Sequence, residues 1–397
     1  MVSAKSLQGT PSWLGAVNDR TALALLLEHG VLTRNRIGEL SGLSKPTASQ
    51  IVSRLESAGL IHVVGEVSAG RGPNAVGYSA RTDRAYGVAV DVTGTGTRAA
   101  IVDASGSDRP VVERLTKQTT GPRSAATDIE WAVLAAADAA GIDPALVRTV
   151  MIGVQGAVDP RTDELSFAEA LPGWPRRAVR SRLEDTLQRG VTIENDVNLA
   201  AVAERTSGAG ADSAGFALLW MGNGLGVAID LGGSLLRGAS GNAGEIGYLP
   251  VPAQASAIDP SATRLQDLMG GPAVSRVLRA HGVPGRTVGE RFEHFASASS
   301  PQRDAAILDL AQRIAIGITP LVAIADPGIV VLGGPTGAAG GDALADAVRT
   351  HVRRTTRWSP DVVATAVVEH PVLRGARDRL VAEVRASLLD DVSSLSA

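Results

Sequence analysis

The sequence predicts an α/β protein with a small winged helix-turn-helix head at the N-terminus, followed by a two-lobed α/β body. Three observations support this prediction. Residues 17–80 contain three helical segments followed by two strands around a glycine-rich loop. After Ala85 the pattern changes to apolar strands that end in glycine turns. That succession of strand, glycine turn, strand and helix occurs twice along the body.

Composition excludes several classes of protein. The 397 residues are 44% hydrophobic and 20% charged, which is typical of a globular chain of two or three domains. We find no apolar run of the ~18–20 residues that cross a bilayer, and no secretory signal at the N-terminus, so a cytoplasmic protein is expected. The absence of cysteine excludes disulfides, thiolate zinc sites and cysteine nucleophiles.

Charge is divided unevenly along the chain. The net charge is −3, which does not favour a protein that coats nucleic acid along its whole length. Residues 1–80 nevertheless carry seven Lys or Arg and five Asp or Glu, a balance of +2, and the remainder carries −5. We predict three domains: a winged helix-turn-helix head (1–80), a first lobe (81–200) and a second lobe (201–397) whose C-terminal helix returns to the first lobe.

The head begins with three helices. Apolar residues at helical spacing predict them over residues 17–30, 34–42 and 44–58. Thr33 and Ser44 are expected to cap the second and third helices. One face of the third helix is apolar and belongs to the core: Ala48, Ile51, Val52 and Leu55.

The opposite face of the third helix is polar and has no acidic residue before Glu56. In a helix-turn-helix, the second helix presents its first turns to base edges in the major groove. The residues expected to read DNA are Lys45, Thr47, Ser49, Gln50 and Arg54.

A wing is expected after the third helix. Residues 60–66 and 75–80 form its strands, around the glycine-rich loop VSAGRGPN. Arg71 and Asn74 in this loop are expected to contact the DNA backbone or a narrow minor groove. An interaction module with an ordinary glycine loop remains the alternative for the head.

The first half of the body is a strand-rich unit. Residues 85–92 and 98–106 form a hairpin around the turn TGTGT, and residues 110–118 offer a third strand. A helix is expected around residues 124–140, with Trp131 and Leu134 facing inward. A strand over 147–154 and a later strand that delivers Glu194, Asn195 and Asp196 to the start of a helix complete this half.

The second half repeats that plan. A strand over residues 215–222 leads into the turn GNGLG and a hairpin-like segment. A long helix over residues 304–326 precedes the strand DPGIVVLGGP. Two such halves predict two lobes around a cleft, where the glycine turns let backbone N–H groups approach an oxygen-rich ligand.

With these motifs, the chain resembles the transcriptional-regulator branch of the ROK family (repressors, open reading frames and kinases). The resemblance runs from about residue 15 to about residue 389 and rests on these stretches: DVTGTGTRAAIVD, GVQGAVDP, LPGW, ENDVNLAA, GNGLGVAID, GNAGEIG and LGG. It implies that the body has the actin-like (ribonuclease H-like), two-lobed sugar-kinase fold.

The resemblance also implies site residues. In the family's kinases the aspartate of the END motif, here Asp196, takes the proton of the sugar hydroxyl that attacks the phosphate. The implied effector-binding residues are Gln155, Asn195, Asp196, Glu245 and Tyr248. The implied nucleotide-loop residues, which we expect to be vestigial, are Asp91, Gly94, Thr95, Gly222, Gly224, Gly333 and Gly334.

Several positions depart from the kinase pattern. Thr93 places a branched side chain in the phosphate turn, and Gly96 supplies no cation there. Asn223 and Ala170 replace a threonine and a sugar-binding asparagine of the kinases. Tyr248 stands where family members usually have a histidine that serves both zinc and the sugar. The cysteines that follow it in the family are also missing. We therefore expect no metal and no cofactor, with ATP and Mg²⁺ needed only if kinase activity persists.

Three hypotheses follow. The first is a DNA-binding regulator, expected to repress carbohydrate-related genes and to respond to a sugar effector between the lobes. The resemblance implies a homodimer or a dimer of dimers and hence a palindromic operator. The alternative is an ATP-dependent sugar kinase that carries a DNA-binding head. The third is a constitutive DNA-binding protein whose body only dimerises.

Overall fold

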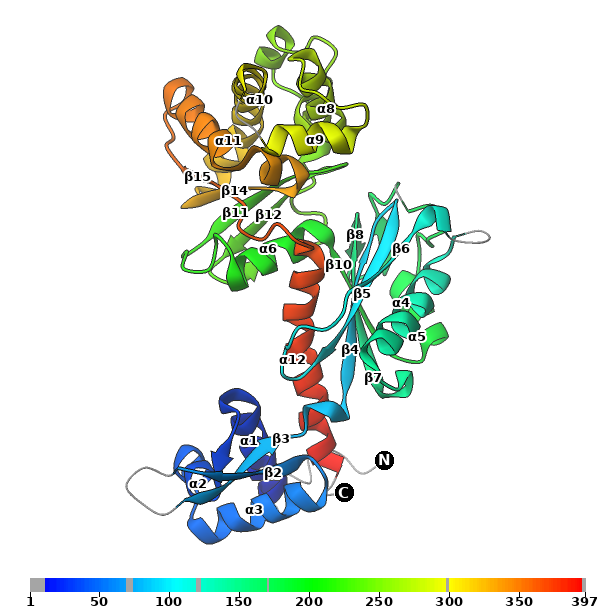
Figure 1. The fold of residues 1–397 in the computed structure, drawn as a ribbon, viewed down its shortest axis with the longest axis vertical. Helices are drawn as coiled ribbons and strands as arrows, with labels where there is room; N and C mark the ends of the chain where they lie inside the picture. Colours follow the sequence, from blue (N-terminus) through cyan, green and yellow to red (C-terminus); the bar gives the residue numbers. More distant parts are fainter. Residues whose placement is uncertain (1–10, 69–73, 119–122, 170, 298–299, 395–397) are drawn as a thin grey trace.

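A computed structural model describes residues 11–68, 74–118, 123–169, 171–297 and 300–394. In Figure 1 a small head and two α/β lobes are arranged along one long axis, and a long helix runs from the lobes to the head. The fold class expected from the sequence, a winged head on a two-lobed body, is confirmed.

The head contains three helices and a small sheet. Its elements are α1 (Pro11–His29), β1 (Leu32–Thr33), α2 (Arg34–Ser41), α3 (Lys45–Ser57), β2 (Ile61–Val67) and β3 (Ala75–Ala80). The strands pair antiparallel in the order β1-β3-β2. Local signals set the helix boundaries: Thr33 accepts a hydrogen bond from the Arg36 N–H, and Ser44 accepts one from the Thr47 N–H. Both predicted caps are confirmed.

The first lobe is built on a five-stranded sheet of order β10-β7-β4-β5-β6, in which β4, β7 and β10 run parallel. Its elements are η2 (Thr82–Arg84), β4 (Tyr86–Val92), β5 (Gly96–Asp103), β6 (Val112–Leu115), η3 (Thr116–Gln118), α4 (Ala125–Ala140), η4 (Pro144–Leu146), β7 (Val147–Val154), β8 (Ala157–Asp159), β9 (Glu164–Ser166), α5 (Val179–Leu187), β10 (Gly190–Asn195) and α6 (Asp196–Ser207). Helices α4 and α5 pack on one face of the sheet.

The second lobe repeats the sheet. Its order is β13-β12-β11-β14-β15, with β11, β14 and β15 parallel and β11, β12 and β13 antiparallel. The elements are β11 (Phe216–Met221), β12 (Leu225–Leu231), β13 (Ser234–Leu235), η5 (Ile246–Tyr248), η6 (Ala253–Ala257), α7 (Leu265–Met269), α8 (Gly271–Ala280), α9 (Val288–Ser297), α10 (Pro301–Ala325), β14 (Ile329–Gly333), α11 (Gly334–Thr355) and β15 (Asp361–Ala364). The repeat expected from the sequence is therefore confirmed.

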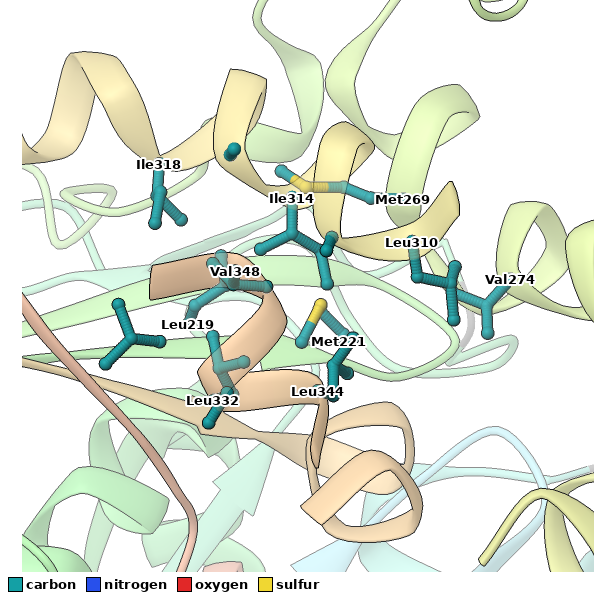
Figure 2. Packing of buried hydrophobic residues seen from close by; sticks show 14 of the residues in the cluster. Leu219, Met221, Met269, Val274, Leu310, Ile314, Ile318, Leu332, Leu344 and Val348 are labelled. Carbon is teal, nitrogen blue, oxygen red and sulfur yellow. The ribbon is translucent and has the colours of Figure 1, made fainter. Parts of the chain in front are cut away.

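The core of the second lobe lies between this sheet and its helices. Figure 2 shows Leu219 and Met221 of β11 and Leu332 of β14 facing the side chains of α10 and α11. Ile314 of α10 and Leu344 of α11 are fully buried among them. This face of the sheet is sealed, so the cleft must open elsewhere.

The final helix, α12 (Pro371–Ser394), connects all three parts. With α6 it packs in a buried cluster that takes side chains from both sheets. The approach of the two helices is close, because a Cβ on Gly375 would lie 1.7 Å from the Leu199 carbonyl oxygen. At its other end Val392 is wholly buried in the apolar core of the head. One rigid element therefore contributes to both lobes and to the head.

Two expectations from the sequence need correction. Leu134 of α4 is 57% exposed, because the buried stripe of this helix is formed by Ile129, Val133 and a series of alanines on the other face. Trp131 is half-buried against that core, as expected.

The second correction concerns the membrane criterion. Among the described residues one helix, α10, is long and apolar enough to cross a membrane. Asp309 and Arg313 interrupt its apolar run, and 56% of its most apolar window is buried within the protein. A core helix meets the same criterion, so α10 is weak support for a membrane span.

Candidate functional site

Two adjoining cavities open between the lobes. The first has a volume of about 200 Å³ and the second about 350 Å³. Four side chains line both cavities: Gln155, Asp196, Trp220 and Asn223. The two cavities are therefore parts of one cleft, with Trp220 of β11 at the passage between them.

The first cavity gathers the expected effector-binding residues. All five of them line it: Gln155, Asn195, Asp196, Glu245 and Tyr248. Among the further side chains that line it without having been predicted as site residues are Phe167, Glu169, Trp220 and Gln266. Phe167 and Glu169 lie in the loop after β9, where no regular periodicity marks them.

Asp196 begins helix α6 and lies at the bottom of the cleft. Its side chain is only 8% exposed, and one carboxylate oxygen accepts the Val197 N–H at 2.9 Å. Burial, with smaller effects of the Asp91 and Glu245 carboxylates, raises the pKa of Asp196 to about 8. Burial also raises the pKa of Asp91 to about 6. The position suits a proton acceptor for a ligand hydroxyl.

Asn195 caps helix α6. Its Oδ1 accepts the Asn198 N–H at 3.1 Å, and its Nδ2 donates to the Gly156 carbonyl at 3.0 Å. The Asn195 side chain is thus fixed in direction by the protein before any ligand arrives. The adjacent Glu194 accepts bonds from Arg237 and Arg379, which joins this strand end to the second lobe and to α12.

Tyr248 forms part of an aromatic wall of the first cavity. Its ring lies 4.9 Å from that of Phe167, and its hydroxyl donates to Glu169 at 3.2 Å. The Arg264 guanidinium lies 5.7 Å from the same ring. Glu245, one turn earlier, has its pKa raised to about 7 by burial and by the Glu169 charge.

The phosphate turn of the first lobe is closed by its own side chain. The Thr93 hydroxyl accepts the N–H groups of Thr95 and Gly96, at 3.3 and 3.2 Å. Backbone N–H groups in such a turn are those that would hold a phosphate oxygen. The substitution at Thr93 therefore occupies the donors as well as adding bulk.

A cation is present beside this turn although Gly96 supplies none. Arg98, two residues farther along β5, lines the second cavity with its guanidinium 3.7 Å from Asp91 and 2.6 Å from Glu113. The period of two along a strand places residues 96 and 98 on the same face. That alternation was the signal that could have indicated Arg98 from the sequence.

The other expected nucleotide-loop residues are distributed around the cleft. Asp91, Thr95, Gly222 and Gly334 line the second cavity, and Gly224 lines the first. Gly333 caps helix α11. Gly94 lines neither cavity, and its carbonyl instead accepts the Thr116 hydroxyl at 3.1 Å.

Ion pairs join the segment of the second lobe after Tyr248, where the family's cysteines are missing, to helix α10. Arg313 of α10 lies 2.6 Å from Asp309 and 3.3 Å from Asp259, and His281 lies 3.0 Å from Asp309. Within the described residues no three His, Asp or Glu side chains lie together as a metal site would require. Whether the protein binds a metal stays a prediction.

The described residues that are expected to contact DNA lie on α3 and beside strand β3 of the head. Lys45 and Gln50 of α3 are exposed, and Thr47 and Ser49 are half-buried beside them. Arg54 differs, because Asp19 of α1 holds its guanidinium through two contacts of 2.9 and 2.5 Å. Asn74 is exposed beside Glu66, and Arg71 lies outside the described residues.

Family models match most of this chain. The model described as ROK family matches residues 87–381. The model described as winged helix-turn-helix DNA-binding matches residues 17–62. Together they cover the head and the body in the order that the structure shows.

Individual relatives agree with this division. A bifunctional enzyme NanE/NanK of Brucella suis biovar 1 (strain 1330) is 30% identical over 295 residues, 73% of this chain and 52% of that protein. A candidate xylose repressor of Caldicellulosiruptor sp. (strain Rt8B.4) is 24% identical over 82% of this chain and 84% of its own. The chain spans only about half to three fifths of the leading curated relatives that it matches.

A solved structure matches nearly the full length. The crystal structure of a ROK family transcriptional regulator, a homologue of the E. coli MLC protein, superposes with a TM-score of 0.70. It is 18% identical and covers 95% of this chain and 99% of its own. At that identity the likeness concerns the fold of the head and body together.

Proposed function

Because this chain belongs to the ROK family and carries a winged helix-turn-helix head, we propose that it is a sequence-specific DNA-binding transcriptional regulator controlled by a sugar or sugar derivative bound between its lobes. A relative named as a candidate repressor shares most of its length. We therefore propose repression as the direction of control. The regulated genes are carbohydrate-related.

One observation carries this proposal: α12 is part of both the ligand cleft and the head. Its first residues, Pro371 and Val372, line the second cavity, and Val392 is buried in the head core. A 24-residue helix spans about 36 Å at 1.5 Å per residue. A ligand that favours one arrangement of the lobes thereby favours one position of the head.

The DNA contacts are assigned from exposure and pairing. Lys45, Thr47, Ser49 and Gln50 read or approach base edges, and the wing contacts the backbone. Arg54 orients α3 on α1 through its ion pair with Asp19, and because its side chain stays 47% exposed it also remains a candidate for a DNA contact. Two copies of the chain bind a palindromic operator as a homodimer or a dimer of dimers.

A gel-shift titration with the gene's own promoter region tests the proposal. We expect a sequence-specific, salt-sensitive complex whose affinity changes when the effector is added. Retention of the complex after scrambling the DNA sequence, or the lack of any complex in a genome-wide pull-down, would contradict it.

The second candidate is a sugar kinase. Asp196 at the cleft and Arg98 beside the phosphate turn favour it, whereas the turn closed by Thr93 opposes it. A kinase would release ADP from ATP in the presence of some hexose. The substitution Asp196→Asn would abolish this release. We expect no turnover with a panel of sugars, and measurable turnover would establish the kinase.

A further inference from the structure

The head contains an exposed arginine that has no acidic partner. Within residues 11–68 and 74–80 the head has five lysine and arginine side chains. Three of them pair with a carboxylate: Arg20 with Asp390, Arg36 with Glu39, and Arg54 with Asp19. The side chains of Arg34 and Lys45 form no ion pair and no hydrogen bond with the described residues. The sequence predicted a DNA contact for Lys45 and gave no role to Arg34.

A buried ring fixes the direction of Arg34. Its guanidinium lies 5.2 Å from the centroid of the Tyr78 ring. Tyr78 belongs to β3 and is only 2% exposed in the apolar core of the head, so its ring is a firm support. An aromatic face attracts a guanidinium without cancelling its charge. Arg34 is therefore held in place as a full cation, whereas the Asp19 carboxylate offsets the charge of Arg54.

Arg34 lies between the two parts of the head that are expected to contact DNA. Helix α2 follows β1 directly, and β1 pairs with the wing strand β3, where Leu32 is opposite Tyr78. On its other side α2 lies against α3. The two helices are close, because a Cβ on Gly38 would lie 3.4 Å from the Ala48 Cβ. The start of α2 therefore joins the wing to the helix that is expected to read bases.

The two unpaired cations lie near this contact between α2 and α3. Arg34 is four residues before Gly38, and Lys45 is three residues before Ala48. At 1.5 Å per residue these separations are about 6 Å and about 4.5 Å along the helix axes. A helix-turn-helix places its second helix in the major groove and its first helix across the sugar-phosphate backbone. Arg34 therefore lies on the element that passes the phosphates.

Acids on the neighbouring elements are already engaged. Glu39 of α2 lies 3.0 Å from Arg36, and Glu66 of β2 accepts the Asn74 amide at 3.4 Å. Within the part of the chain that the structure describes, no carboxylate lies within ion-pair distance of Arg34. A phosphate would meet no internal competitor for this guanidinium.

Resting on the proposed function, we propose that Arg34 binds a phosphate of the DNA backbone between the recognition helix α3 and the wing. The planar guanidinium, with several N–H donors, matches the oxygens of a phosphate. Tyr78 is a positioning residue that acts through Arg34 and does not touch DNA. Because a phosphate carries no base identity, Arg34 adds affinity and fixes the register of the head without adding sequence preference.

The test uses the full chain with a fragment of the gene's own promoter region and a scrambled fragment of equal length. Fluorescence anisotropy at several salt concentrations gives the slope of log affinity against log salt for each. Arg34→Gln should lower this slope by about 1 and weaken both complexes by about tenfold, because one phosphate contact is lost. Arg34→Lys keeps the charge and should keep the slope.

A matched control removes a neutral ion pair from the same helix. The double variant Arg36→Gln/Glu39→Gln leaves the net charge of α2 unchanged and should leave the salt slope unchanged. Thermal unfolding confirms that each variant folds.

The role of Tyr78 is tested in two backgrounds. Tyr78→Leu should weaken both DNA complexes by about threefold when Arg34 is present, and Tyr78→Phe should not, because phenylalanine keeps the aromatic face. In the Arg34→Gln background the same change to leucine should have no further effect on DNA affinity. A purely structural role of the ring would act equally in both backgrounds.

Three results overturn the inference. The first is a salt slope of Arg34→Gln equal to that of the unchanged protein. The second is a loss confined to the promoter fragment, which would make Arg34 a reader of bases. The third is an equal loss of slope in Arg34→Lys and Arg34→Gln. In each case a specific promoter complex of the unchanged protein leaves the regulator proposal standing, whereas the absence of any such complex removes the proposed function and this inference together.

Discussion

At the scale of single residues, hydrogen-bond partners decide what each predicted side chain does. Thr93 closes the phosphate turn because its hydroxyl accepts two of the N–H groups of that turn. Asn195 caps α6, which leaves Asp196 free to face the cleft. Arg54, which is expected to read DNA, also forms an ion pair with Asp19, and its contact with DNA stays a prediction. The sequence identified these positions, and it could not identify their partners.

Substitutions of two exposed residues of α3 should affect sequence specificity and general DNA affinity differently. Gln50→Ala should reduce the preference for the operator over random DNA by about 1–3 kcal/mol, because an amide that reads a base edge is lost. Lys45→Ala should instead lower the slope of log affinity against log salt by about 1, because one phosphate contact is lost. Fluorescence anisotropy at several salt concentrations measures both, with Ser57→Ala as the control. Equal effects of the two changes on specificity would contradict the assignment.

The buried carboxylate of Asp196 should give stability a characteristic pH dependence. Its pKa is raised from 3.8 to about 8 in the folded protein, so folding favours the protonated form. The resulting stabilisation is complete below the unfolded pKa and is lost as the pH rises toward 8. Asp196→Asn should therefore raise the melting temperature above pH 8, by about 2–4 °C for each 1 kcal/mol, and change little at acidic pH.

Thermal unfolding across the pH range measures this effect. Asp212→Asn, the same change at an exposed position, is the matched control. A constant difference between Asp196→Asn and the unchanged protein at all pH values would show that the carboxylate is not buried in its acidic form.

At the scale of elements, most boundaries could be predicted because their signals are local. Ser44 and the helix ends at Gly30 and Gly42 were visible as capping residues. Leu134 was assigned to the wrong face, because the many alanines of α4 blur its apolar stripe and tertiary packing then decides which side is buried. Arg98 was not predicted, because it lies in strand β5 beyond the turn and reaches the second cavity only through the tertiary arrangement.

The ion-pair network around Arg313 should stabilise the second lobe without metal. Arg313→Met leaves Asp259 and Asp309 without their shared cation and should cost about 2–4 kcal/mol of stability. A chelator should leave the melting temperature of the unchanged protein unaltered. Calorimetry measures both effects, and a clear fall in melting temperature with the chelator would indicate a metal in this lobe.

At the scale of the whole molecule, α12 makes the body and the head one mechanical unit. Its apolar end enters the head core, and the ion pairs Arg20–Asp390 and Arg148–Asp391 hold it to α1 and to the first lobe. Coupling through such an element needs two arrangements of the lobes that a ligand distinguishes.

Removing the contact of α12 with the head should uncouple the two parts. Val392→Ala should destabilise the head by about 1–3 kcal/mol through the cavity left in its core. Hydrogen exchange should then rise in α1 and α3 and stay unchanged in the second lobe. Exposed Val111 supplies the control, Val111→Ala. If hydrogen exchange were the same in Val392→Ala and Val111→Ala in every part of the protein, α12 would not connect the head to the body.

The sequence by itself determined the elements, their order, the duplicated lobes and the family, because caps, turns and apolar periodicity are written in neighbouring residues. Only the tertiary structure decided that Glu169, Asp196 and Glu245 share one cavity with three aromatic rings, and that the last helix ends inside the first domain. Such contacts join residues up to several hundred positions apart, as Arg20 and Asp390 do. They depend on how whole layers pack against one another, which no local pattern records.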